Sequence, residues 1–115
     1  MNEITEIKDV KQWEAIKSNL EASEELVIFK YSPICSISAS VEMDFNSWQS
    51  GLAEDVKLKF ARVNVIKARD ASRRIAEDIN VLHQSPQVIW LKGNAEVKWS
   101  ASHFDITKES LGAQL

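Results

Sequence analysis

The chain has 115 residues, of which 44% are hydrophobic and 27% are charged, a composition typical of a folded protein and not of a disordered one. We therefore interpret residues 1–115 as a single domain. Four Trp and four Phe supply large apolar side chains for a core. The formal net charge of -3 argues against nucleic acid as a main partner, because phosphate binding needs clustered cations.

The cysteine count and the N-terminus indicate the compartment. A single cysteine, Cys35, cannot form an intramolecular disulfide, which is typical of a reducing compartment. Residues 1–9 are polar and lack the apolar core of a signal peptide. No apolar run approaches the roughly 20 residues that span a bilayer. The sequence therefore predicts a cytoplasmic protein with no membrane partner, and a monomer is the expectation for this size.

Helical and strand patterns alternate along the first half of the chain. Asp9 can cap a helix in which the apolar residues share one face. Those residues are Val10, Trp13, Ile16 and Leu20. Residues 26–29 form a short apolar run, as in a strand covered on both faces. After Cys35 a second helix is predicted, ending near Gly51, from apolar residues at helical spacing. They are Ile37, Val41, Phe45, Trp48 and Leu52.

The second half continues the alternation. Residues 58–65 alternate like a strand with one wetter face. Asp70 can start a third helix, in which Ala71, Ile75 and Ile79 line up. Residues 87–91 and 96–99 read as two strands joined by a turn at 93–94.

Thr107 can cap a short last helix, with Ile106 and Leu111 as a hydrophobic staple. The order of all these helices and strands predicts the fold class. The first two strands are joined through a helix and should be parallel, whereas the tight turn makes the last two antiparallel. We therefore expect an α/β protein with a mixed four-stranded sheet and helices on both faces. That arrangement resembles the thioredoxin fold.

Cys35 is the candidate nucleophile, because it lies where the first predicted strand gives way to a helix. A thiol in the first turn of a helix faces unpaired backbone N–H groups and the positive end of the helix dipole. Both favour the thiolate, which is the nucleophilic form. A lone cysteine can also be a small buried hydrophobe whose packing explains it, so the surrounding sequence has to decide.

Four segments of the chain, in order, resemble the monothiol bacilliredoxins, the YtxJ-like bacillithiol-system redox proteins of the thioredoxin-like superfamily. The segments are Lys30-Tyr31-Ser32, Ile37-Ser38-Ala39, Ser85-Pro86-Gln87 and residues 101–107. The resemblance implies a cis peptide bond before Pro86, which is chemically reasonable because X–Pro bonds adopt cis at modest cost. A plain proline at a strand entry is the alternative.

The residue at the position of a resolving cysteine points to the type of reaction. A dithiol protein of this fold has its second cysteine three residues after the first, where this chain has Ser38. After Cys35 attacks a disulfide, an external thiol must therefore complete the exchange. This favours removal of a small thiol from a mixed disulfide over general disulfide reduction. The resemblance implies bacillithiol as the co-substrate and S-thiolated cytosolic proteins as partners, although the residues alone do not select bacillithiol over glutathione or coenzyme A.

Several residues near the cysteine are candidates for supporting roles. Ser38 lies one helical turn beyond Cys35, and its hydroxyl can donate a hydrogen bond to the thiolate or simply cap its own helix. The family usually has proline directly after its cysteine, whereas this chain has Ser36 there and Pro33 two residues before it. This departure bears on the loop shape and the rate. Lys30 is interpreted as a solvated strand lysine or, less often, as a positive charge near the thiol.

The predicted proline loop and the two histidines complete the candidate site. Pro86, if cis, would lie opposite the thiol, and the backbone of Ser85 would pair with an extended substrate segment. His103 belongs to the fourth family-like segment and is a candidate for binding acidic groups of the small thiol. With Cys35, His83 and His103 offer only three metal ligands without a recognised spacing, so no metal is expected.

Two other functions are compatible with the sequence. Some single-cysteine proteins of this fold carry an iron–sulfur cluster, usually with glycine after the cysteine, whereas Ser36 is bulkier. The chain can also be a binding module that keeps the fold without turnover.

Overall fold

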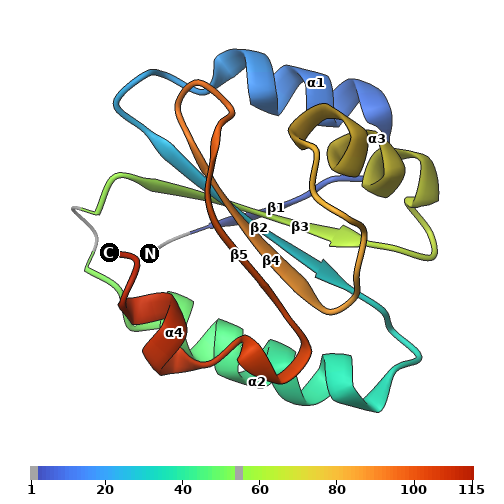
Figure 1. Ribbon diagram of the computed structural model, residues 1–115, viewed down its shortest axis with the longest axis vertical. Coiled ribbons are helices and arrows are strands. Elements are labelled where there is room, and N and C mark those ends of the chain that lie inside the picture. Colours follow the sequence, from blue (N-terminus) through green and yellow to red (C-terminus); the bar gives the residue numbers. More distant parts are fainter. Residues whose placement is uncertain (1–2, 54–55) are drawn as a thin grey trace.

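One mixed sheet of five strands organises the chain (Figure 1). The computed structural model describes residues 3–53 and 56–115, so residues 1–2 of the polar N-terminal stretch lie outside the described part. The strand order is β1-β3-β2-β4-β5. Both β1 and β2 run parallel to β3, whereas β4 runs antiparallel to β2 and to β5. The strands are β1 (Ile4–Glu6), β2 (Glu25–Tyr31), β3 (Leu58–Asn64), β4 (Gln87–Lys92) and β5 (Val97–Ser102).

The predicted sheet is confirmed except for its strand number, because β1 was not expected. That strand has only three residues and pairs through Ile4 with Phe60 of β3. A segment of three residues with one partly buried apolar side chain carries no detectable alternation. The parallel central pair and the final hairpin are present as predicted.

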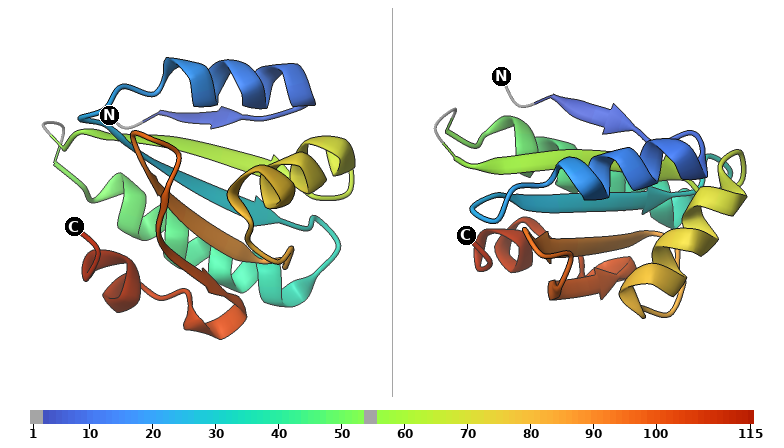
Figure 2. Two further views of the ribbon diagram at one scale, coloured as in Figure 1. Left: turned by 45° about the horizontal axis from the view of Figure 1, so that its top comes forward. Right: turned by 90° about the horizontal axis from the view of Figure 1, so that it is seen from above.

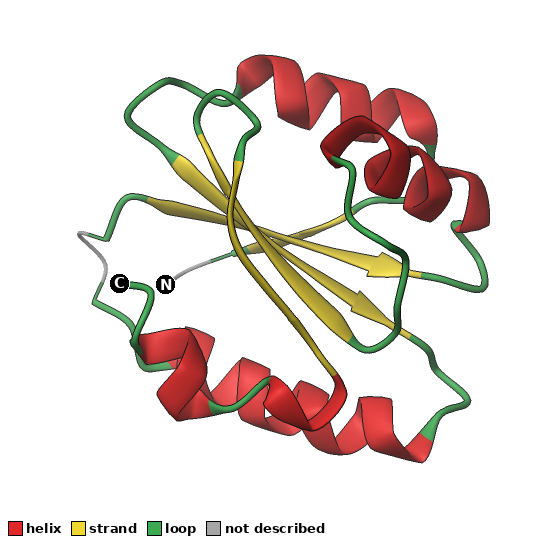
Figure 3. Cartoon of the chain, viewed as in Figure 1, coloured by secondary structure: helices red, strands yellow, loops and turns green. Residues whose placement is uncertain are grey.

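Helices cover both faces of the sheet, as Figures 1 and 3 show. Helices α1 (Val10–Asn19) and α3 (Arg69–Ile79) lie on one face. Helices α2 (Ser36–Ser50) and α4 (Lys108–Gly112), with the short 3-10 turn η1 (His103–Asp105), lie on the other. None of the helices in the described part of the chain is long and apolar enough to cross a bilayer.

The helix ends follow from their capping residues. The side chain of Asp9 accepts a hydrogen bond from the backbone N–H of Gln12 at 2.8 Å and caps α1 as predicted. Gly51 ends α2. Thr107 caps α4 in a reciprocal pair of hydrogen bonds with Ser110, which satisfies two otherwise free backbone N–H groups.

The two faces of the sheet bury different kinds of side chain. The α1/α3 face is mainly aliphatic, with Trp13 as its one buried aromatic among the described residues. The α2/α4 face is aromatic: Phe45 stacks on Phe29 at 4.8 Å between ring centroids, and Trp48 lies 5.8 Å from Trp90. Successive residues of β2 point to opposite faces, so Ile28 belongs to the first core and Phe29 to the second.

The two loops that matter for the site lie at the same end of the sheet. The β2–α2 loop carries Cys35, and the α3–β4 loop carries Pro86. All views in Figures 1 and 2 place these loops beside each other, past the end of β2. The fold therefore brings segments about 50 positions apart in the chain to one place.

Candidate active site

Cys35 lies in the tight turn between β2 and α2. Its backbone N–H approaches the carbonyl of Ser32 at 3.4 Å, and its own carbonyl accepts the N–H of Ala39 at 3.2 Å. Its backbone is extended (φ -104°, ψ 123°), so it is the residue that caps α2 at its N-terminus. Cys35 is a free cysteine, and the residue is half-buried. The predicted position at the junction of strand and helix is confirmed.

The residues next to Cys35 in the turn are exposed at the surface. Pro33 and Ser36 are exposed, and Ile34, directly before the cysteine, is 84% exposed. An exposed isoleucine contributes nothing to the core but can contact a partner. The roles assigned to Pro33 and Ser36 in shaping the turn stay predictions.

Ser38, at the position of a resolving cysteine, is almost fully buried. Its Oγ accepts a hydrogen bond from the backbone N–H of Ser32 at 3.0 Å, which ties the start of the turn to the first turn of α2. The hydroxyl proton is still available for donation, because a hydroxyl both donates and accepts. Donation to the Cys35 thiolate stays a prediction.

The predicted proline loop contains a cis peptide bond between Ser85 and Pro86. Pro86 is buried, and its carbonyl accepts the backbone N–H of His103 at 3.0 Å. His103 itself has a left-handed backbone (φ 55°) and is exposed. The structure thus brings together Pro86 and His103, two residues from different family-like segments. Their binding roles stay predictions.

Lys30 corrects the sequence interpretation, because it is not solvated. It is fully buried, and its Nζ donates to the backbone carbonyl of Ser72 in α3 at 2.9 Å. The Nδ1 of His83 lies 3.4 Å from the same nitrogen. The cause is strand alternation, which turns Lys30 toward the α1/α3 face together with Ile28. Burial lowers the pKa of Lys30 to about 8.

His83 lies in the α3–β4 loop, three residues before Pro86. The residue is exposed, but its Nδ1 lies near Nζ of Lys30 and 3.3 Å from the hydroxyl of Ser72. Partial burial, with the charges of Lys30 and Arg73, lowers the pKa of His83. An ammonium can only donate, so Nδ1 is the acceptor and the ring proton of the neutral form is on Nε2.

A second cation, Arg62, lies on the α2/α4 face, near Tyr31 at the end of β2. The guanidinium of Arg62 stacks on the ring of Tyr31 at 4.2 Å. It forms ion pairs with Glu6 at 3.0 Å and Glu42 at 3.5 Å. The Tyr31 hydroxyl donates to Glu6 at 3.1 Å, so the end of β2 is fixed by a small charged network.

Within residues 3–53 and 56–115, no group of three or more His, Cys, Asp and Glu side chains could hold a metal ion.

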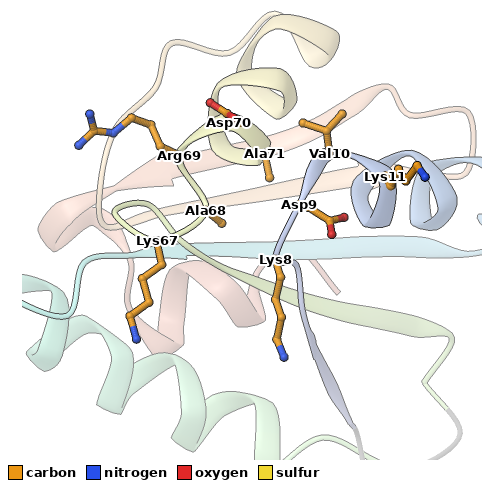
Figure 4. A pocket seen from close by; sticks show the side chains of 9 residues that line it. All are labelled: Lys8, Asp9, Val10, Lys11, Lys67, Ala68, Arg69, Asp70 and Ala71. Carbon is orange, nitrogen blue, oxygen red and sulfur yellow. The ribbon is translucent and has the colours of Figure 1, made fainter.

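A hollow of the surface lies away from this turn. It is a cavity of about 450 Å³ lined by residues 8–11 and 67–71, where α1 and α3 begin. Figure 4 shows Lys8 and Lys67 extending on one side of it, while Arg69 points away. None of its lining residues belongs to the turn around Cys35 or to the loop before Pro86. This hollow is therefore separate from the candidate site at Cys35.

Solved structures with a similar fold include an oxidoreductase and several thioredoxins. A proposed oxidoreductase with a thioredoxin fold matches with a TM-score of 0.79 and 27% identity, over 96% of this chain and 92% of the other. Thioredoxin of Malassezia sympodialis matches with a TM-score of 0.73 and 18% identity, over 98% and 88%. Thioredoxin of Fasciola hepatica matches with 0.72 and 12%, over 95% and 93%. The two thioredoxins support the fold alone.

The family comparison is more specific. The sequence pattern of the family described as monothiol bacilliredoxin BrxC matches residues 5–111, which includes the turn around Cys35, the Pro86 loop and His103. The match covers nearly the whole chain, in agreement with the four family-like segments of the sequence. The chain belongs to the monothiol bacilliredoxin family, whose thiol redox role agrees with the geometry around Cys35.

Proposed function

We propose that this protein removes bacillithiol from mixed disulfides on other proteins, with Cys35 as the nucleophile and bacillithiol as co-substrate. The observation that supports this most directly is the pairing of a free, half-buried thiol at Cys35 with a buried serine at position 38. The Ser38 hydroxyl is bonded to the turn and offers no second sulfur. A monothiol site retains the small thiol until another thiol releases it.

The cycle has two balanced exchanges. The Cys35 thiolate attacks the bacillithiol sulfur of a protein mixed disulfide, a new Cys35–bacillithiol disulfide forms, and the substrate cysteine leaves as a thiolate. A second bacillithiol thiolate then attacks that adduct, which gives bacillithiol disulfide and regenerates the Cys35 thiolate. The substrate cysteine is reduced, and one free bacillithiol is oxidised as it joins the transferred bacillithiol in bacillithiol disulfide.

Local groups support these exchanges in different ways. Cys35 is the N-cap residue of α2, although its side chain makes no capping hydrogen bond to the first turn. The helix dipole and the N–H groups of that turn, which have no partner within the helix, are the proposed support for negative charge on the sulfur. The backbone of Ser85, next to the cis bond, is a candidate partner for an extended substrate segment. His103, beside Pro86, is a candidate for contact with the carboxylates of bacillithiol.

The test measures release of bacillithiol from a bacillithiolated protein and then the intact mass of the present protein. The wild type should release it and carry a bacillithiol adduct at Cys35, whereas Cys35→Ser should do neither. Equal release by both proteins rejects the proposal. Parallel oxidation with the disulfides of bacillithiol, glutathione and coenzyme A identifies the preferred thiol, because the fastest adduct on Cys35 names it.

A second variant tests the monothiol step. Ser38→Cys places a sulfur where a resolving cysteine would be, so it should expel bacillithiol from Cys35 as an internal disulfide without added thiol. Ser40→Cys, with an exposed side chain on the same helix, is the matched control and should not. Persistence of the adduct in Ser38→Cys would contradict the assigned role of position 38.

A further inference from the structure

The α1/α3 face contains a polar cluster of three buried residues and one exposed histidine that the proposed chemistry does not use. It consists of Lys30 in β2, Ser72 in α3, His83 in the α3–β4 loop and Gln87 at the start of β4. Lys30 and Gln87 are direct neighbours across the antiparallel β2–β4 pair, so their side chains share one face. Both are at least nine-tenths buried, at 0% and 4% exposure. Two family-like segments, residues 30–32 and 85–87, therefore meet in this cluster.

Both side chains hold the loop that leads to Pro86. The Nζ of Lys30 lies 3.4 Å from Nδ1 of His83, and the Nε2 of Gln87 donates to the carbonyl of Leu82 at 3.0 Å. The loop is thus held at two consecutive residues, three and four positions before Pro86. Leu82 is itself 80% exposed, so apolar packing of its side chain does not fix the loop.

The cluster has a cost that packing does not explain. Lys30 donates to a carbonyl and faces an imidazole, and no carboxylate pairs with it in the described part of the chain. A buried ammonium without a counter-ion opposes folding, because burial removes its hydration. Likewise, Oε1 of Gln87 is buried without a hydrogen-bond partner among the described residues. Polar groups kept at such a cost indicate a role other than stability.

We infer that Lys30 is a positioning residue for the thiol exchange, which together with Gln87 fixes the loop at Leu82 and His83 and so places Ser85 and Pro86 beside Cys35. This inference rests on the proposed function, because it concerns the approach of a disulfide to the Cys35 thiol. Lys30 acts through His83 and does not contact the sulfur in this scheme. The β2–α2 loop and the α3–β4 loop lie side by side at the end of β2 (Figures 1 and 2). The position of the α3–β4 loop therefore affects how a disulfide reaches Cys35.

The first experiment separates positioning from the chemistry of the thiol. Lys30→Met keeps a long unbranched side chain but removes the charge and the donor. We expect kcat/KM for release of bacillithiol from a mixed disulfide to fall by at least about tenfold, since small misplacement in a site has large rate effects. Alkylation of Cys35 by iodoacetamide, which needs no aligned substrate, should change by less than about twofold. Lys92→Met, at the exposed far end of β4, is the matched control and should behave as the wild type.

The second experiment tests the contact to the loop. His83→Asn keeps an acceptor oxygen close to the position of Nδ1, whereas His83→Leu has none. Rescue by asparagine and a decline of about fivefold or more with leucine would support the inference. If Lys30→Met or His83→Leu released bacillithiol within about twofold of the wild type, the inference would be overturned.

The resting protein provides a readout that does not depend on the substrate. NMR titration of His83 should show Nδ1 unprotonated and a pKa below its ordinary value in the wild type, rising in Lys30→Met. An unchanged His83 titration in the variant overturns the inference. If the wild type releases glutathione but not bacillithiol, the proposed function fails, and the same variants compared on the glutathione adduct still decide the role of Lys30.

Discussion

Two cations near the end of β2 have opposite surroundings. On the α2/α4 side, Arg62 lies between the carboxylates of Glu6 and Glu42 and stacks on Tyr31. On the α1/α3 side, Lys30 is fully buried with a backbone carbonyl and the imidazole of His83 as its partners. Burial opposes the charge of both. The interactions with Tyr31 and with the two carboxylates nevertheless raise the pKa of Arg62, whereas burial alone lowers the pKa of Lys30.

This contrast indicates which of the two charges stabilises the fold. A cation with two carboxylates is compensated within the folded protein, and removing it leaves like charges facing each other. A buried cation without a carboxylate is uncompensated, and removing it relieves a cost. We therefore expect loss of Arg62 to affect mainly stability and loss of Lys30 to affect mainly activity.

Loss of core packing should change stability most, and it gives a reference for judging the two cations. Phe45 is fully buried in α2 and stacks on Phe29, so Phe45→Ala should lower the free energy of unfolding by about 3–5 kcal/mol, through lost burial and the cavity left behind. Urea denaturation measures this. Met43→Ala, on the same helix with 74% exposure, is the control and should cost less than about 0.5 kcal/mol. A loss below 1 kcal/mol for Phe45→Ala, on the scale of about 3–5, would mean that charge and not packing dominates this face.

The next effect concerns Arg62 itself. Arg62→Met should lower the free energy of unfolding by about 1–2 kcal/mol, because Glu6 and Glu42 lose their shared cation in a half-buried setting. Activity should stay within about twofold. Lys59→Met, which breaks an exposed pair with Glu24, is the control and should cost about 0–1 kcal/mol. A large loss of activity at unchanged stability would reverse the roles that we assign to the two cations.

Replacing Lys30 should not lower the free energy of unfolding, in contrast to the two substitutions above. Lys30→Met should leave the free energy of unfolding at pH 7 unchanged or raise it by up to about 1 kcal/mol, because an uncompensated buried charge is replaced by an apolar chain of similar length. Urea denaturation beside Lys92→Met checks this. A loss above about 2 kcal/mol would show that Lys30 is mainly a structural residue, held for its bonds to Ser72 and His83.

The sequence predicted those features whose causes are local. Asp9 and Thr107 cap their helices as expected, because capping depends on residues within one turn. The position of Cys35 at the start of α2 also follows from the adjoining apolar patterns. The cis bond before Pro86 was expected through the family resemblance, and the structure contains it.

Features that depend on contacts between distant parts of the chain could not be predicted from the sequence. The burial of Lys30 depends on Ser72 and His83, which lie 42 and 53 positions away. Polar residues in strands are usually exposed, so composition favoured the wrong interpretation. A signal was nevertheless present: Lys30 continues the alternation of Leu26 and Ile28, which predicts its face but not what covers it.

The two cations should also differ in their pH dependence. The pKa of Lys30 is about 8 in the folded protein and near the ordinary 10.5 when unfolded, so between these values the unfolded chain binds more protons. The free energy of unfolding should therefore gain a rising contribution as the pH increases from about 8 toward 10.5. Lys30→Met should lack that contribution, whereas Arg62→Met should keep it, because Arg62 stays charged throughout this range.

Urea denaturation at intervals of pH 7.5 to 10 measures this difference, and subtracting the Lys30→Met curve from the wild-type curve isolates the contribution. A flat difference curve would mean that Lys30 titrates alike in the folded and unfolded chains. The ammonium would then be compensated after all, most directly by water at the unpaired Oε1 of Gln87, and the contrast with Arg62 would lose its electrostatic basis.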